Sequence, residues 1–214
     1  MDADLKNQNN EAGRIKPGLV VALLFLTVIY RVAAPSFHIA VNTAPVMAVC
    51  FGGALLLGLR FWWIPILLLL VSDGILGLTH EGGGIGKYTL MSAAYYSLVA
   101  WVGSRAGRWS GKIWPMMWCG TLIASTGFYL FANTFAWVVS PEYMKTFAGW
   151  WQSQTVGLPQ FSPPSWVFLR NAIIADTIWC ALAGVIFFGK TLPLTVSEKT
   201  GSSSFPLPEG RKSD

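Results

Sequence analysis

The chain has 214 residues, a formal net charge of +5 at pH 7, and a composition that is 53% hydrophobic and 12% charged. Soluble domains carry about 25% charged residues, so this chain has too little polar surface to cover a soluble globule. The composition therefore argues against an ordinary soluble domain and predicts a membrane protein.

Six apolar segments are long enough to be membrane-spanning helices, which need about 20 residues each. They follow a leader at residues 1–16 and occupy about residues 17–33, 43–59, 61–78, 88–103, 113–139 and 165–189. The sequence thus predicts an all-α, polytopic membrane protein in which residues 17–189 form a bundle of six transmembrane helices. Ser140, Pro141 and Glu142 are residue types that start helices, so we expect a short interfacial helix at about 141–156. Residues 190–214 lack a periodic apolar face and are expected to be a disordered tail.

The basic residues predict how these helices are oriented. Lys and Arg are concentrated in the leader, in the tail and in two connections, the latter at Arg60, Arg105, Arg108 and Lys112. Because Lys and Arg favour the cytoplasmic side, both ends of the chain are expected to be cytoplasmic. The outer side then receives the connection around residues 82–87 and the stretch 140–164.

Polar side chains gather in the outer halves of the predicted helices. Asp73 and Asp176 lie about 10 Å and about 9 Å below the outer helix ends at a rise of 1.5 Å per residue. An ionisable group inside a membrane is costly, which indicates either a partner or a function. We expect an outward-opening polar cavity with aromatic walls, whose ligand-binding residues are Asp73, Asn133, Arg170, Asn171, Asp176, Trp137, Tyr95 and Tyr96.

Structural roles are open for several of these residues. The two acids could instead pair with Arg170 or hold helix turns together. Asn133 could form an interhelical hydrogen bond, and Trp137 could belong to the aromatic belt at the membrane surface. The cluster as a whole therefore indicates a site better than any one member does.

The connection between the third and fourth helices reads THEGGGIGKYT. It is not a Walker A phosphate loop, since Glu81 stands where that motif requires Gly and Tyr88 where it requires Ser or Thr. Its glycines suit a plain connector. The alternative is a lid over the pocket, formed by His80, Gly82, Gly83, Gly84 and Lys87.

Small residues recur every four positions on the second helix, at Ala44, Ala48 and Gly52. This spacing lets another helix approach closely. Packing within the bundle is the favoured interpretation, and contact with a partner protein is the alternative.

No catalytic or metal-binding motif is evident. His80-Glu81 is not followed by the second His of a metalloprotease motif, there is no G-x-S-x-G, and the three cysteines lack metal-ligand spacing. We therefore expect no enzyme activity, no cofactor, no metal site and no nucleic-acid partner.

The stretch NTAPVMAVCFGGALLLGLRFWWIPILLLLVSDGIL resembles the second and third helices of the substrate-binding S components of energy-coupling factor (ECF) transporters. It shares with them a Pro near the helix start, a glycine-rich second helix, a tight inner turn and an Asp in the third helix. The chain resembles most closely a group of uncharacterised bacterial membrane proteins of S-component-like pattern, which carry ANTFAW in the fifth helix and FLRNAIIAD in the sixth.

The resemblance implies a multi-pass protein of the bacterial cytoplasmic (inner) membrane that captures a vitamin-like or other small organic micronutrient from the outer side for uptake. It implies the lipid bilayer and a small-molecule ligand as partners, together with an energy-coupling module made of a transmembrane scaffold and ATPases. The first helix departs from the S-component pattern of alanines four apart, because Ala22 is followed by Leu26. A solitary transporter without that module is therefore an open alternative, as are a solitary membrane enzyme and a structural or assembly subunit without a transported ligand.

Overall fold

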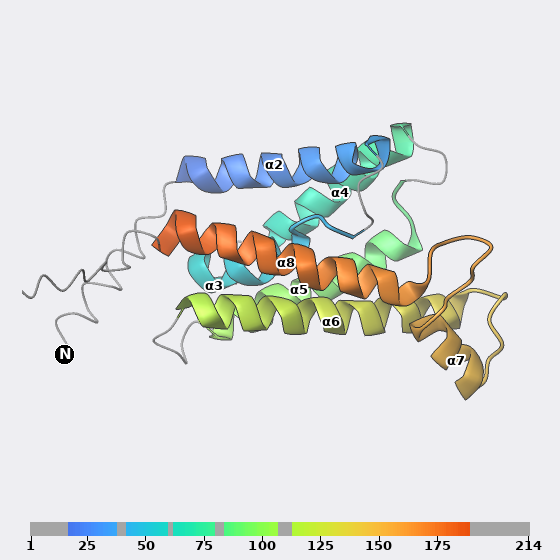
Figure 1. Cartoon of the computed structure of the whole chain (residues 1–214). Helices are drawn as coiled ribbons and strands as arrows, with labels where there is room; N and C mark the ends of the chain where they lie inside the picture. The colour runs from blue at the N-terminus through green and yellow to red at the C-terminus, as the bar shows by residue number, and fades with distance from the viewer. Residues whose placement is uncertain (1–16, 38–41, 60–61, 80–83, 107–112, 189–214) are drawn as a thin grey trace, which may run out of the picture.

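The computed structural model describes residues 17–37, 42–59, 62–79, 84–106 and 113–188, and every regular element in this part of the chain is a helix (Figure 1). The elements are α2 (Pro17–Ser36), η1 (Ala48–Gly52), α3 (Gly53–Leu57), α4 (Trp63–Thr79), α5 (Lys87–Ala106), α6 (Ile113–Val139), α7 (Phe147–Gln154) and α8 (Ser165–Phe188). The prediction of an all-α fold is confirmed.

Proline and glycine mark several helix ends. Pro17 is the first residue of α2, and Pro65 and Pro115 are the third residues of α4 and α6. A proline in the first turn removes no intrahelical hydrogen bond, because the N–H groups there have no partner within the helix. α3 ends at Leu57 and is followed by Gly58, whose φ of 78° is a conformation that suits glycine.

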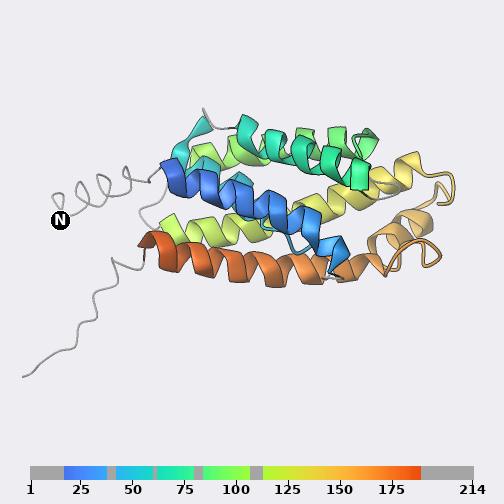
Figure 2. The same ribbon diagram turned by 90° about the horizontal axis from the view of Figure 1, so that it is seen from above.

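The long helices lie side by side in one bundle (Figures 1 and 2). α6 packs along α8, α4 packs against α2 and α5, and η1 contacts α5, α6 and α8. The start of α2 and the end of α8 lie at the same end of the bundle, and α7 lies at the opposite end, which we call the α7 end. The buried apolar core is centred on η1 and includes Cys50, Phe51, Leu69 and Val99.

The second helix is less regular than predicted. It begins at Val46 rather than at residue 43, and residues 48–52 form the π-helical turn η1 before α3 continues the helix. Two glycines make room for it. A Cβ on Gly103 of α5 would lie 2.7 Å from the Phe51 carbonyl oxygen, and a Cβ on Gly120 of α6 would overlap the Phe51 ring. Phe51 therefore packs between two helix faces that carry no side chain at the point of contact.

The small residues of this segment pack inside the bundle. Ala44 is partly buried against the core, and a Cβ on Gly52 would lie 3.0 Å from the Met117 sulfur of α6. Ala48 begins η1, which contacts α5, α6 and α8. The observed contacts are thus those of packing within the bundle, the interpretation that the sequence favours.

The short helix after α6 begins later than predicted. α7 starts at Phe147 instead of residue 141, and its N-cap is Thr146, not Ser140. The Thr146 hydroxyl accepts a hydrogen bond from the Gly149 N–H, as an N-cap side chain does. The Ser140 hydroxyl donates instead to the Glu142 carboxylate, which holds the pKa of Glu142 below its usual value. Residues 141–146 consequently form turns that bring the chain to Thr146.

Two helices of the described chain are long and apolar enough to cross a membrane: α6, and α8 from Ser165 to Ile186. Only 17% and 28% of their apolar windows are buried within the molecule. Large apolar side chains such as Ile123, Ile178 and Val185 are therefore exposed. The core helix of a soluble protein would instead be mostly buried.

Candidate functional site

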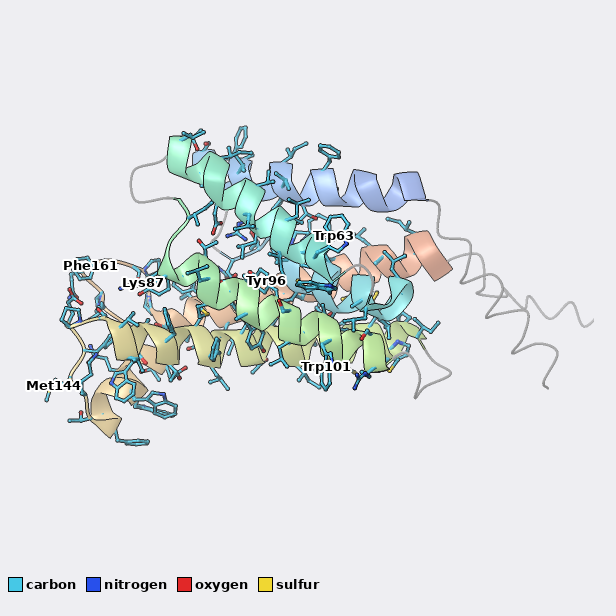
Figure 3. All side chains as sticks on the ribbon, turned by 180° about the vertical axis from the view of Figure 1, so that it is seen from behind. Trp63, Lys87, Tyr96, Trp101, Met144 and Phe161 are labelled. Atoms are coloured by element: carbon cyan, nitrogen blue, oxygen red, sulfur yellow. The ribbon has the colours of Figure 1, made fainter. Side chains whose placement is uncertain are left out.

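A cavity of about 340 Å³ lies between α2, the segment 42–47, α5, α6 and α8. At about 1.5 Å per residue, its lining residue Arg31 is about 21 Å from the start of α2, and Ser92 is about 8 Å from the start of α5. The cavity therefore extends from the middle of the bundle toward the α7 end. Figure 3 shows Tyr96 among the helices and Met144 and Phe161 at the α7 end. The polar lining consists of Arg31, Asn42, Thr43, Ser92, Tyr96, Ser125 and Asp176, and the apolar lining includes Val46, Met47 and Phe128.

An ion pair at the cavity wall joins α2 to α4. Arg31 Nη2 lies 2.6 Å from Asp73 Oδ1, and the two side chains are 23% and 12% exposed. The Thr89 hydroxyl of α5 donates to the second carboxylate oxygen of Asp73 at 2.7 Å. Hydrogen bonds between charged groups are roughly twice as strong as neutral ones, so this cluster fixes three helices relative to one another.

A second acid, Asp176, lies in the middle of α8 and is 3% exposed. Its carboxylate accepts a hydrogen bond from the Ser125 hydroxyl of α6. Among the described residues, no Lys, Arg or His lies within 4.0 Å of this carboxylate. Asp176 thus lines the cavity without the cationic partner that Asp73 has.

The segment before η1 is held by side chains instead of helix hydrogen bonds. Asn42 has a left-handed φ of 62°, and its side-chain amide donates to the Phe168 carbonyl of α8 at 3.2 Å. The Thr43 hydroxyl accepts a hydrogen bond from Tyr30 at 2.9 Å, and the Thr43 carbonyl accepts one from Trp179 at 3.1 Å. Asn42, Thr43 and Ala44 of this non-helical stretch line the cavity, and Asn42 and Thr43 bring polar side chains to it.

The predicted ligand-binding residues divide into two groups. Tyr96 and Asp176 line the cavity, and Asp73 contacts it indirectly because it binds Arg31. The alternative pairing of an acid with Arg170 is not observed in the described structure, where Arg31 is the partner of Asp73. Asp73 is thus a residue that positions Arg31 at the cavity.

The remaining polar candidates are outside the cavity lining. Asn133 donates to the Tyr129 carbonyl one turn earlier at 2.9 Å, an intrahelical bond rather than the interhelical one considered above. The exposed Arg170 donates to Asn171 Oδ1 at 3.2 Å, and its guanidinium lies 5.3 Å from the Trp166 ring centroid. Asn171 is itself buried.

The other two aromatic candidates also have partners elsewhere. The Tyr95 hydroxyl donates to the Ala124 carbonyl at 2.9 Å, and Trp137 donates to the Met144 carbonyl at 2.9 Å. Tyr95 therefore joins α5 to α6, and Trp137 joins the end of α6 to the turn before α7.

The lid interpretation rests largely on residues outside the described chain, namely His80, Gly82 and Gly83. Gly84 is described and has a φ of 118°, where a side chain would be strained. Lys87 is the first residue of α5, and its ammonium lies 5.6 Å from the Tyr88 ring centroid. Neither Gly84 nor Lys87 lines the cavity.

Arg31, Thr43 and Ser125 are cavity residues that the sequence did not single out. A charged residue within an apolar helix is a signal of function, but a helix ending at residue 33 would place Arg31 at the membrane boundary. α2 continues to Ser36, so Arg31 lies five residues before the end of the helix. Ser125 is one of several hydroxyl residues on α6, and nothing in its spacing distinguishes it.

The lining supplies the chemistry of non-covalent recognition. It combines one carboxylate that has no cationic partner among the described residues, the paired guanidinium of Arg31, several hydroxyl groups, one amide, and the aromatic rings of Tyr96 and Phe128. No group of three or more His, Cys, Asp or Glu side chains is placed to hold a metal ion in the described part of the chain.

Residues 12–194 match a family of unknown function, DUF6580. Since the match covers most of the sequence, the chain belongs to this family. No curated protein and no solved structure gives a significant match.

Proposed function

We propose that this DUF6580 protein is a multi-pass membrane protein that binds a small organic molecule in its cavity, for uptake from the side of the membrane on which α7 lies. The observation that carries the proposal is a 340 Å³ space with charged and hydroxyl-bearing walls, inside a bundle whose outer surface is rich in apolar side chains. Small-molecule sites are typically concave, about 300–1,000 Å³ in volume, and mostly apolar with a few placed polar groups.

The outward apolar surface supports a membrane location. It extends beyond α6 and α8 to Leu67 and Val71 of α4 and to Leu90 and Leu98 of α5, all of which are exposed. Soluble monomers rarely expose contiguous apolar patches larger than a few hundred Å². A lipid environment would cover these side chains.

The helix lengths support several spans. α2, α4 and α5 have 20, 17 and 20 residues. At 1.5 Å per residue these correspond to about 30, 26 and 30 Å, close to the hydrocarbon thickness of about 30 Å. With α6 and α8 they make five long spans, and we assign the shorter segment 42–57 as the sixth.

The basic residues support an orientation with the α7 end outside. Eleven of the 15 Lys and Arg residues belong to the segments that precede α2, join α3 to α4, join α5 to α6 or follow α8, or to the last turn of α5. Only Lys87, Lys145 and Arg170 belong to the α7 end. The rule that Lys and Arg stay on the cytoplasmic side therefore favours cytoplasmic ends for α2 and α8.

The resemblance of residues 42–76 to S components supports uptake as the purpose of binding. In those proteins the ligand lies between helices near the outer face. The cavity has a comparable place here, because it extends from the middle of the bundle toward the α7 end.

A cavity-filling substitution tests the proposal. Ala172 of α8 is buried and lines the cavity, whereas Ala181 of the same helix is exposed. Full-length wild-type protein, Ala172→Phe and Ala181→Phe would be purified in mild detergent and examined by native mass spectrometry for a retained small molecule. We expect wild type and Ala181→Phe to retain it and Ala172→Phe to lose it while eluting as a monodisperse protein. Retention by Ala172→Phe, or no retained molecule in any sample, would contradict the proposal.

A further inference from the structure

Asp176 is a buried acidic residue of the cavity that has no cationic partner among the described residues. It is 3% exposed and accepts a hydrogen bond from the Ser125 hydroxyl. A carboxylate removed from water is strongly disfavoured unless it is paired with a cation or gives up its charge. One neutral hydroxyl donor does not neutralise it.

The other charges near the cavity cancel each other. Arg31 and Asp73 form a direct ion pair at 2.6 Å, and Thr89 holds the far oxygen of Asp73. The charge of Arg31 is therefore balanced by Asp73, and among the described residues no basic side chain lies within 4.0 Å of Asp176. The cavity has one negative charge in excess when Asp176 is ionised.

The rest of the lining suits an organic cation. The Phe128 and Tyr96 rings line the same cavity as the carboxylate, and aromatic faces attract ammonium groups. Val46 and Met47 provide apolar surface for the body of a molecule. In the described chain the acids do not form a metal-ligand cluster, which disfavours a divalent ion as the occupant.

We propose that the ligand of this cavity carries a protonated amine or other positively charged nitrogen, which binds Asp176 while its apolar body lies against Phe128, Val46 and Met47. This inference rests on the proposed function, because it names the chemical class of the molecule that the site takes. The Ser125 hydroxyl then orients the carboxylate, and because Arg31 and Asp73 neutralise each other, Asp176 is the uncompensated charge among the described residues that line the cavity.

Three probes that share one aromatic body and differ in charge test the inference. They are 2-phenylethylamine, 2-phenylethanol and phenylacetate, titrated calorimetrically into full-length protein in detergent. For wild type we expect the amine to bind at least 10-fold more tightly than the alcohol and the acid to bind weakest. Asp176→Asn should reduce the ratio between amine and alcohol to near one. Asp176→Glu should keep a preference for the amine.

Glu142→Gln is the matched control, because it removes the same charge from an exposed position in the turn before α7. It should leave the preference for the amine unchanged. The inference is overturned if wild type binds the alcohol or the acid at least as well as the amine, or if Asp176→Asn keeps the preference. It is also overturned if the molecule retained in native mass spectrometry contains no basic nitrogen; each of these results leaves the proposed binding function standing. Absence of both probe binding and a retained molecule would refute the binding function as well.

Discussion

The ion pair between Arg31 and Asp73 offers a direct test of how the cavity wall is held. Replacing Arg31 with Met removes the cation and leaves Asp73 with Thr89 as its remaining hydrogen-bond donor in the described structure. Breaking a fully buried pair lowers the free energy of unfolding by about 3–5 kcal/mol. Because 23% of the Arg31 side chain and 12% of the Asp73 side chain are exposed, we expect a smaller loss, about 2–3 kcal/mol.

Thermal unfolding in detergent, followed by tryptophan fluorescence, would measure this loss. A change of 1 kcal/mol shifts the melting temperature of a chain of this size by roughly 2–4 °C, so Arg31→Met should lower it by roughly 4–12 °C. Asp73→Leu should have a similar effect. The double variant should recover most of the loss, since replacing both members of a buried pair by apolar residues is often close to neutral. A double variant as unstable as the sum of the single variants would refute the claim that these two residues stabilise the protein through each other.

Three further predictions concern packing, capping and the limits of the site. Gly120→Ala should lower the free energy of unfolding by about 1–2 kcal/mol, because the added Cβ would overlap the Phe51 ring. Gly74→Ala has open space around it and should raise the free energy of unfolding by up to about 1 kcal/mol; equal melting temperatures for the two variants would contradict the packing of Phe51 against Gly120. Thr146→Ala should lower the stability of α7 by about 1 kcal/mol, because the helix loses its N-cap. Residues 140–160 should then be cleaved faster by a protease, and unchanged proteolysis would argue against the capping role. Arg170→Ala should leave the affinity for the retained ligand within about twofold of wild type, because Arg170 does not line the cavity. A loss of affinity greater than tenfold, which corresponds to about 1.4 kcal/mol, would show that Arg170 contributes to ligand binding.

The sequence predicts the long helices well, because their limits are set by local chemistry. Proline starts α2 and lies in the first turn of α4 and α6, and α6 occupies residues 113–139 in both the prediction and the structure. The start of α7 is less predictable, since Ser140 and Thr146 are both plausible N-caps. At Thr146 the hydroxyl bonds to the Gly149 N–H, and a Cβ on residue 149 would overlap the Met144 carbonyl, so the glycine permits the turn that enters the helix there.

The cavity is only partly predictable, because its members come from five separate segments. The sequence singles out Asp176 and Tyr96 as candidates, and both line it. The sequence does not show which basic residue forms an ion pair with Asp73, because Arg31 and Arg170 both lie near helix ends in the prediction. The choice of Arg31 follows from the packing of α2 against α4, which no local pattern reports.

The spacing of apolar residues also does not predict where the irregular second helix begins. Asn42 and Thr43 precede an apolar run, so they fit the start of a helix as well as they fit an extended segment. What decides between these forms is the set of distant partners, Phe168, Tyr30 and Trp179, that bond to the two residues.

The shortness of this second helix has a consequence for how the protein is made. Its helical residues, 46–57, cover about 18 Å at 1.5 Å per residue, little more than half of a hydrocarbon core of about 30 Å. In the proposed membrane setting such a segment is too short to enter the bilayer alone during synthesis. Arg31, meanwhile, meets its counter-ion only when Asp73 has been made, 42 residues later. We therefore expect α2, the short helix and α4 to enter the membrane as one unit, with ribosome-bound chains that end before Asp73 still extractable by alkaline carbonate.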